Sequence, residues 1–542
     1  MVVTGILVLM QRAVRTSRSV LKFTICTNKM TLPETEFALI ADLIRQHAAD
    51  DPRRRALMEG GRELDYGALD ALLDRIAAAL QRDGLQLGDT IALCAEMSIE
   101  YAAVFLGALR AGVVVAPLAP SATAVSLARM VSDAQARMVF TDAANAAMLQ
   151  QDGLSALPTV TLDDAPVGRA LNDWLAPAGQ KPVPVRLQPQ SPFNIIYSSG
   201  TTGQPKGIVQ SHGMRWAHVR RGAAYGYGPQ TVTLLSTPLY SNTTLVVFFP
   251  TLGFGGTVLL LPKFKALDYL QLAQQQRATH TMLVPVQYQR LMAQAEFDSF
   301  DLSSFQAKFS TSAPFAASLK ADVLKRWPGA LVEFYGMTEG GGTCILEAQL
   351  FPDKLHTVGR PAEGHDIRLI DDNGVEVPAG QAGEVVGHSP GMMLGYHGQA
   401  EKTREAEWFD ASGKRFIRTG DVGRFDADGF LTLIDRKKEL IISGGFNIYP
   451  SDLEAVLRQH PGVAEAAVVG MPSLQWGETP SAYVVRKPGA VIEPQELLQW
   501  VNQRLGKTQR LSSLQFLPEL PRSAIGKVLR RELRQSASVL SR

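Results

Sequence analysis

Between residues 66 and 280 the sequence alternates between amphipathic segments typical of helices and short apolar runs typical of strands. This alternation limits the possible folds more than any other feature. Tyr66–Asp83 predicts a helix with one apolar face, and Ile99–Arg110 predicts a second. The apolar runs Thr90–Cys94 and Val113–Val115 predict buried strands. A regular succession of this kind is typical of an α/β fold with layered parallel sheets.

A long stretch without charge raises the question of a membrane span. Residues 222–262 carry no charged side chain, but Pro229, Pro238 and Pro250 interrupt them together with several glycines. No run of about 20 apolar residues remains, so we expect buried core and no transmembrane segment. The 542 residues are 46% hydrophobic and 20% charged with a net charge of +2, which excludes a disordered chain. This balance of charge also gives no reason to expect binding to nucleic acid.

The second half of the sequence changes character. Residues 153–192 are rich in proline and predict a loop. Residues 364–435 consist of short alternating runs separated by Asp-Asn-Gly and Asp-Gly turns, which predict antiparallel strands. The charged cluster Asp435–Glu439 is the expected boundary, so we predict domains 30–436 and 437–542. In the smaller domain we expect helices and strands at Ser451–Gln459, Ala464–Val469, Ser481–Arg486 and Glu493–Leu505.

The first 29 residues contain five basic residues and no acidic one. The basic residues follow the apolar segment Val2–Met10, whereas a secretory signal peptide places them before it. Residues 1–29 are therefore either a dispensable extension or part of a start assigned too early, with translation beginning at Met30; a transit peptide is the other alternative. The three cysteines are far apart in the sequence, which favours a reducing compartment, and we expect a cytoplasmic protein.

The sharpest local motif is Tyr197-Ser-Ser-Gly-Thr-Thr-Gly-Gln-Pro-Lys-Gly207. Its glycines permit backbone turns whose consecutive amides can hold anionic oxygens, and its hydroxyls add further donors. The lysine precedes Gly207 and Ile208, so the segment is not a Walker motif, in which Ser or Thr follows Gly-Lys. Phe193–Tyr197 predicts the strand that delivers this loop. The residues that we expect to hold phosphate are Ser198, Ser199, Gly200, Thr201, Thr202, Gly203 and Lys206.

Two other patterns in the sequence match known motifs only in part. Gly387-His-Ser-Pro-Gly391 matches the G-x-S-x-G pattern of serine hydrolases, in which the amide after the serine stabilises the oxyanion. That residue is Pro390, which has no N–H, so we do not expect a hydrolase. The nine histidines include no His-Glu-x-x-His segment, so we expect no protein zinc site.

Together with the glycine-rich loop, motifs along the chain resemble those of the adenylate-forming enzymes: acyl-CoA synthetases, firefly luciferase and peptide-synthetase adenylation domains. The resemblance covers about residues 36 to 535. It implies a large N-terminal AMP-binding α/β domain with a small β-rich subdomain, followed by a small, mobile α+β domain. Its motifs are Tyr335-Gly-Met-Thr-Glu339, Arg418-Thr-Gly-Asp421, Asp435-Arg-Lys-Lys438, Ser443-Gly-Gly-Phe-Asn-Ile-Tyr-Pro450 and Pro521-Arg-Ser-Ala-Ile-Gly-Lys527.

The resemblance implies a role for each motif. Lys527 would contact the carboxylate and the α-phosphate, Lys206 would hold the departing pyrophosphate, and Glu339 would be the magnesium ligand, with Ser198 beside it. These roles suit a reaction between two anions, which needs preorganised donors around the phosphate. The remaining residues implied in ATP and AMP binding are Ala313, Tyr335, Gly336, Thr338, Asp421 and Arg436.

The second substrate follows from the same resemblance. Lys438 would be the hinge between domains, and Gly444 and Gly445 would border a tunnel for the pantetheine arm of CoA. Only 15 residues follow Lys527, so no fused carrier domain is expected, and Leu431–Ile448 lacks the insertion of fatty acyl-AMP ligases.

We therefore expect an AMP-forming acyl-CoA synthetase of fatty-acid metabolism that uses ATP, Mg²⁺ and CoA. One alternative is an adenylation enzyme that loads a carrier protein in trans, and the other is a silent nucleotide-binding homologue. The oligomeric state, monomer or homodimer, stays open.

The pocket for the acid should lie between the glycine-rich loop and the Tyr335 segment. Its candidate residues are uncharged, so we expect a predominantly apolar acid, whether fatty, alicyclic or aromatic, and neither an amino acid nor a short dicarboxylate. Many relatives carry histidine where this chain has Ser241, followed by Asn242. The smaller side chain would either open the pocket or bind a polar substituent. The candidates are Trp216, Tyr225, Tyr240–Thr244, Ala313 and Met337.

Overall fold

A computed structural model describes most of the chain, and the described residues from 36 onward belong to one compact unit, Leu32–Arg542. Several sequence predictions fall outside the described residues, namely segment 1–29, Ser199, Gly200, Thr201, Thr202, Gly203, Lys438, Gly444 and Gly445. The structure describes residues 36–149, 157–163, 168–198, 206–436, 439, 441–443, 446–473, 476–506, 509–523 and 526–540.

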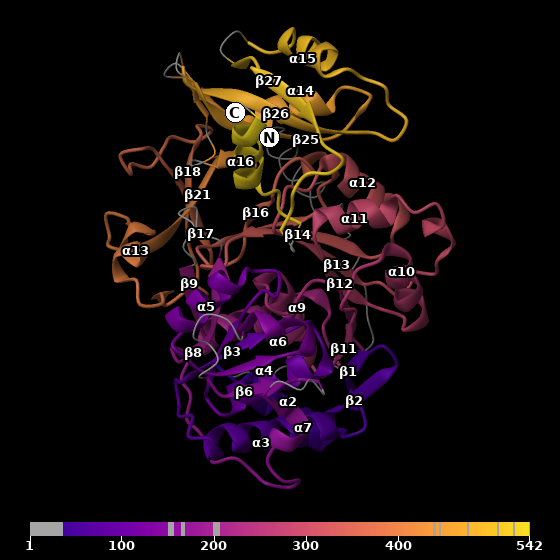
Figure 1. Ribbon diagram of the computed structural model, residues 1–542, viewed down its shortest axis with the longest axis vertical. Coiled ribbons are helices and arrows are strands. Elements are labelled where there is room, and N and C mark those ends of the chain that lie inside the picture. Colours follow the sequence, from indigo (N-terminus) through magenta and orange to yellow (C-terminus); the bar gives the residue numbers. More distant parts are fainter. Residues whose placement is uncertain are drawn as a thin grey trace, which may run out of the picture. The chain divides into compact units, whose positions relative to one another are not determined.

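The predicted α/β fold is confirmed by two large, mainly parallel sheets (Figure 1). In the first, the described strands from β8 to β7 run parallel, and β9 and β19 extend the sheet antiparallel. Its central strands are apolar and buried on both faces. The strand order is β19 (Gly395–Tyr396), β9 (Lys206–Ser211), β8 (Pro192–Ser198), β4 (Val114–Pro117), β3 (Thr90–Cys94), β5 (Ala136–Thr141), β6 (Thr159–Thr161) and β7 (Arg169–Ala170).

The second large sheet carries the Tyr335 segment at the end of a parallel strand. Its six inner strands from β14 to β1 are parallel, and β2, β15 and β16 are antiparallel. The order is β16 (Arg360–Pro361), β15 (Thr343–Glu347), β14 (Ala330–Gly336), β13 (Ala307–Ser310), β12 (His280–Leu283), β10 (Val232–Leu235), β11 (Thr257–Leu260), β1 (Arg55–Glu59) and β2 (Arg62–Asp65).

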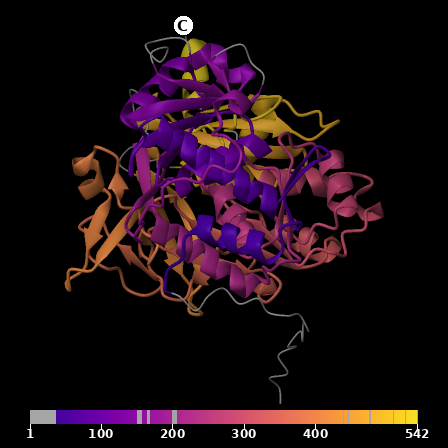
Figure 2. The same ribbon diagram turned by 90° about the horizontal axis from the view of Figure 1, so that it is seen from below.

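Two further sheets account for the predicted antiparallel region and the C-terminal unit. The third sheet, orange in Figures 1 and 2, is entirely antiparallel, as predicted for residues 364–435. It contains β17 (Asp366–Ile370), β18 (Gly383–His388), β20 (Glu407–Phe409), β21 (Arg415–Phe425) and β22 (Leu431–Arg436). The fourth contains β23 (Ile441–Ser443), β24 (Phe446–Ile448), β25 (Val463–Ser473), β26 (Gly477–Arg486) and β27 (Ser513–Phe516). The exact domain boundary stays a prediction.

Helices connect the strands where the apolar periodicity predicts them. Strand β3 and helix α4 have the predicted bounds, and α3 ends one residue earlier than expected. The proline-rich segment 153–192 is not wholly a loop, because β6, β7 and α7 lie within it. The helices are α2 (Ile40–Asp50), α3 (Tyr66–Arg82), α4 (Ile99–Arg110), α5 (Ala124–Asp133), α6 (Ala143–Leu149), α7 (Leu171–Trp174), α8 (His212–Arg221), α9 (Asn242–Gly253), α10 (Ala266–Gln275), α11 (Pro285–Met292), α12 (Ala317–Arg326), α13 (Ala400–Glu405), α14 (Pro450–Arg458), α15 (Pro494–Asn502) and α16 (Arg530–Leu540), with short 3₁₀ turns at Gly222–Tyr225, Phe297–Ser299 and Pro352–Lys354.

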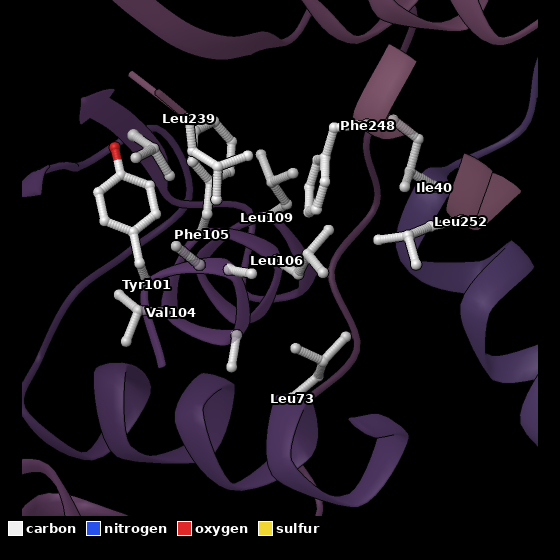
Figure 3. Packing of buried hydrophobic residues seen from close by; sticks show 14 of the residues in the cluster. Ile40, Leu73, Tyr101, Val104, Phe105, Leu106, Leu109, Leu239, Phe248 and Leu252 are labelled. Carbon is white, nitrogen blue, oxygen red and sulfur yellow. The ribbon is translucent and has the colours of Figure 1, made fainter. Parts of the chain in front are cut away.

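The largest core surrounds α4, and Figure 3 shows its side chains. Phe105 and Leu106 of α4 lie among Leu73 of α3 and Phe248 and Leu252 of α9. Helix α9 is part of the uncharged stretch and is buried between the layers, as predicted. Within the described part of the chain, no helix has the length and apolar character needed to cross a membrane.

A buried carboxylate ties α3 to the end of α4. Asp74 Oδ1 lies 2.9 Å from Arg110 Nη1 and 2.6 Å from Arg45 Nη2, and Asp74 Oδ2 lies 2.6 Å from Lys181 Nζ. Burial opposes ionisation of Asp74, but the three cations outweigh it and hold the pKa of this carboxyl below its usual value. The ionised carboxylate therefore stabilises the folded state.

We expect Asp74→Asn to lower the free energy of unfolding by about 2 kcal/mol at pH 7, because the surrounding cations lose a charged acceptor, while Arg110 keeps Asp70 Oδ1 at 2.6 Å from its Nη2 as a remaining carboxylate partner. The difference in the free energy of unfolding between wild type and variant should have its full size above about pH 4. It should decrease as the pH falls through the lowered pKa of folded Asp74. Urea denaturation between pH 3 and 7 measures both. The control Asp268→Asn, at an exposed ion pair, should cost less than about 0.5 kcal/mol. A constant difference at all pH values would contradict this account.

Candidate active site

Two neighbouring strands and a tyrosine fix one carboxylate of the site. The register of β21 and β22 places Asp421 opposite Arg436, and Arg436 Nε lies 3.0 Å from Asp421 Oδ1. Tyr335, near the end of β14, donates its hydroxyl to Asp421 Oδ2 over 2.8 Å. Burial raises the pKa of Asp421, although Arg436 and Tyr335 favour the ionised form. The carboxylate is thus oriented, with lone pairs left to accept from ligand hydroxyls.

A turn near the C-terminus holds Lys527 within range of the charge on this carboxylate. Asp421 and Arg436 lie close enough to change the pKa of Lys527, which burial lowers. The turn is closed by two hydrogen bonds, Ser523 N–H to the Lys527 carbonyl over 2.8 Å and Lys527 N–H to Ser523 Oγ over 3.2 Å. Gly526 has a φ of +75°, and a Cβ there would lie 2.8 Å from Val286 Cγ1. The turn therefore requires glycine both for its backbone conformation and for its approach to α11.

A second cluster surrounds Glu339. Tyr396 in β19 donates its hydroxyl to Glu339 Oε1 over 2.9 Å, and Lys206 Nζ lies 4.9 Å from the centre of the Tyr396 ring. Burial raises the pKa of Glu339, while Tyr396, Lys206 and Arg436 oppose this. The structure thus places Glu339 and Lys206 around the same tyrosine, and their roles at the phosphates stay predictions. The sequence prediction missed Tyr396, whose two-residue strand has no detectable periodicity.

A single carboxylate suits a magnesium ion that is carried by phosphates, since Mg²⁺ keeps few protein ligands. Among the described residues, no group of three or more His, Cys, Asp or Glu side chains could hold a metal by itself. Glu339 fits the role of one oxygen ligand to a metal–nucleotide complex. For Ser198 the backbone is described, paired with Lys206 at the end of β8, and its role stays a prediction.

Other predicted nucleotide residues border these clusters. The Thr338 carbonyl accepts a hydrogen bond from Gln210 Nε2 over 2.8 Å. Gly336 is exposed, and Ala313 is half-buried. Ser312, just before Ala313, has a φ of +80°, a strained value for a residue with a side chain. Thr243 holds it through a hydroxyl contact of 2.6 Å.

In the described part of the chain, the predicted acid-pocket residues have different surroundings. Trp216 belongs to the main core and donates its indole N–H to the Glu36 carbonyl over 2.8 Å. Met337 packs against a separate apolar cluster that includes Met393. Tyr240 borders a cavity of about 350 Å³ that Gly526 also borders. Their roles in acid binding stay predictions.

The rejected hydrolase pattern has a structural explanation. Ser389 is buried, and its hydroxyl donates to the Gly340 carbonyl over 2.6 Å. The same oxygen accepts from the Gly391 N–H over 3.0 Å. The first contact holds the turn against the Glu339 segment, and the second closes the turn itself, so the serine has a structural role.

Comparison with known proteins finds similar sequences and structures along most of the chain. The family model "AMP-binding enzyme" matches residues 44–397, and the model "AMP-binding enzyme C-terminal domain" matches residues 452–527. The chain is 32% identical over 496 residues to a protein named feruloyl-CoA synthase from an Amycolatopsis species, covering 90% of this chain and 97% of that protein. It is 32% identical over 513 residues to one named indoleacetate–CoA ligase from Aromatoleum aromaticum, covering 92% and 98%. Among solved structures, ATP-bound MatB from Rhodopseudomonas palustris matches with a TM-score of 0.81 and 31% identity, covering 93% of this chain and 100% of that one.

We expect Tyr396→Phe to move the pH dependence of Mg²⁺-ATP binding. Loss of the hydroxyl removes a hydrogen bond to ionised Glu339 and raises the pKa of this carboxyl further, so protonation should persist to higher pH. The acidic limb of binding should shift upward by about half a pH unit or more, while the ring beneath Lys206 remains.

Calorimetric titration between pH 5 and 8 measures the shift. A matched control is Tyr269→Phe, which removes a hydroxyl bonded to Thr281 in the core. An identical shift in both variants, or none in Tyr396→Phe, would rule out coupling through Tyr396.

Proposed function

The chain belongs to the AMP-binding enzyme family, as an AMP-forming acid–thiol ligase, and we propose that it converts a predominantly apolar carboxylic acid into its CoA thioester. The observation that carries the proposal is the position of Lys527. Lys527, from the last part of the chain, lies within range of the charges of Asp421 and Arg436, the pair to which Tyr335 also donates. A cation near an oriented carboxylate and a tyrosine suits the binding of a nucleotide whose α-phosphate is attacked by a second anion, the carboxylate of the acid.

In the first step, a carboxylate oxygen of the acid attacks the α-phosphorus of ATP. The bond from that phosphorus to the bridging oxygen breaks, and pyrophosphate leaves. Lys527 would neutralise charge on the α-phosphate and the acid, and Lys206 would accompany the leaving group. Asp421 would accept from the ribose hydroxyls, and Tyr335 would present its ring to adenine. When bound with the nucleotide, Mg²⁺ would supply charge neutralisation at the phosphates, with Glu339 as its protein ligand.

In the second step, the CoA thiolate attacks the carbonyl carbon of the acyl-adenylate. The carbon–oxygen bond to AMP breaks, AMP leaves, and the thiol proton passes to solvent. The hinge at Lys438 and the tunnel at Gly444 and Gly445 belong to this step in the proposal. The names of the two curated relatives, feruloyl-CoA synthase and indoleacetate–CoA ligase, support an aromatic acid and CoA.

We expect Lys527→Ala to slow acyl-adenylate formation by at least about a thousandfold, because a preorganised cation at the transition state is lost. The variant should still convert a chemically supplied acyl-adenylate into the thioester. Pyrophosphate exchange and single-turnover thioester assays measure the two steps separately. The exposed Lys487→Ala is the control and should retain both. Equal loss of both steps in a folded Lys527→Ala protein would refute the assignment.

A panel of acids tests the function and the acid class together. Octanoate, palmitate, cyclohexanecarboxylate, benzoate or a hydroxycinnamate should give a higher kcat/KM than malonate, acetate or phenylalanine. We expect a broad profile, because an apolar pocket gains only about 1–3 kcal/mol per methylene. AMP release that requires CoA supports the thioester reaction. Acid-dependent pyrophosphate exchange without thioester formation favours the carrier-protein alternative, and no exchange with any acid favours a silent homologue.

A further inference from the structure

A buried arginine lies between the paired strands β8 and β9 and helix α9. Arg215 in α8 is fully buried, and its hydrogen bonds run to three side-chain amides. Nε and Nη2 donate to Asn194 Oδ1 over 3.2 and 3.1 Å, Nη1 donates to Asn242 Oδ1 over 2.8 Å, and Nη2 also donates to Gln210 Oε1. Within the described ranges, no carboxylate pairs with this guanidinium.

The charge of Arg215 persists despite burial. Burial lowers the pKa of Arg215 to about 9, which leaves the group mainly protonated at neutral pH. The rings of Phe193 and Phe249 lie 5.8 and 5.7 Å from the guanidinium carbon and offset part of the lost hydration. Burying a cation with only neutral acceptors lowers the stability of the fold. The charge of Arg215 also acts on the side-chain amides that accept its hydrogen bonds.

That field sets the orientation of the Asn242 amide. Asn242 Oδ1 accepts from Arg215 Nη1 and lies 3.5 Å from Gln210 Nε2, so the oxygen faces the buried donors. The amide nitrogen must then point the other way, because its two polar atoms diverge from one carbon. Asn242 is half-buried, and no acceptor for Nδ2 occurs in the part of the chain that the structure describes.

Asn242 stands where the acid is expected. It begins α9, and the next residue, Thr243, holds Ser312 just before Ala313. On its other side, Gln210 holds the Thr338 carbonyl in the Tyr335–Glu339 segment. Asn242 is therefore flanked by both segments that border the proposed nucleotide site.

We propose that Asn242 Nδ2 donates a hydrogen bond to an oxygen acceptor on the acid, away from its reacting carboxylate, and that Arg215 is the residue that positions this donor. The substrate class is an otherwise apolar acid that carries an ether, carbonyl or phenolic oxygen. An acceptor is required because Asn242 Oδ1 is already engaged by Arg215. This inference rests on the proposed acid activation and narrows its substrate class.

Matched acids that differ by one atom test the donor. Each pair replaces an ether oxygen by a methylene: 4-methoxycinnamate with 4-ethylcinnamate, 4-methoxybenzoate with 4-ethylbenzoate, and 8-methoxyoctanoate with decanoate. The readout is the ratio of kcat/KM for the ether to that for the hydrocarbon. Because each ratio is measured on one enzyme sample, a partly unfolded variant does not change it. On the scaffold that the wild type uses best, we expect a ratio of about five or more.

Two isosteric variants separate the donor from the charge. Asn242→Asp keeps an oxygen for Arg215 but replaces Nδ2 by an acceptor, so the ratio should fall by about tenfold or more. Asn194→Asp offers Arg215 the same negative charge on the opposite side, and the ratio should stay within about twofold of the wild type. Thermal melting checks that both variants fold.

The outcomes distinguish failure of this inference from failure of the proposed acid activation on which it rests. Loss of the ratio in Asn242→Asp alone supports the donor. Three results would overturn it: a wild-type ratio of one or less on every scaffold, an unchanged ratio in Asn242→Asp, or equal losses of the ratio in both variants. In each of these cases the hydrocarbon acids would still be activated. If no acid of any pair is activated by the wild type, the proposed function itself fails.

Discussion

The pairing of Asp421 with Arg436 is the interaction on which the candidate site depends. The antiparallel register of β21 and β22 makes them neighbours, so their approach follows from the backbone and needs no flexible side-chain search. Tyr335 then reaches the same carboxylate from β14, and Lys527 in the C-terminal turn lies within range of its charge. The low exposure of Asp421 strengthens its interactions, since the attraction between charges weakens with water around them, although Arg436 itself is exposed.

The sequence predicted most of the periodic structure. Strand β3 and helix α4 have long, consistent patterns, and their bounds are confirmed. Strands β6 and β7 were missed because they are three and two residues long, and only pairing with neighbours defines them. Strand β27 and helix α16 were not predicted either; β27 is only four residues long and is defined by its pairing with β26.

The site was predictable to the extent that its residues form contiguous motifs. Asp421, Arg436 and Lys527 each lie in a segment that resembles a family motif, and the structure brings these three together. Tyr396 has no such segment, and it acts through a hydroxyl that finds Glu339 only in the folded chain. The apolar pocket candidates were chosen by residue type alone. Residue type does not determine which way a side chain points, so the role of Trp216, which packs in the main core, stays a prediction.

The Arg215 cluster could not be predicted from the sequence, because its four members lie on β8, β9, α8 and α9 and form no contiguous motif. Each alone is an ordinary polar residue. Together they replace apolar packing by a buried cation, which by itself lowers stability and can raise specificity. The Asp421 cluster and the Arg215 cluster thus share one physical feature. In each, a buried ion fixes the direction of a neighbouring polar group before any ligand arrives, so a ligand finds that group already oriented.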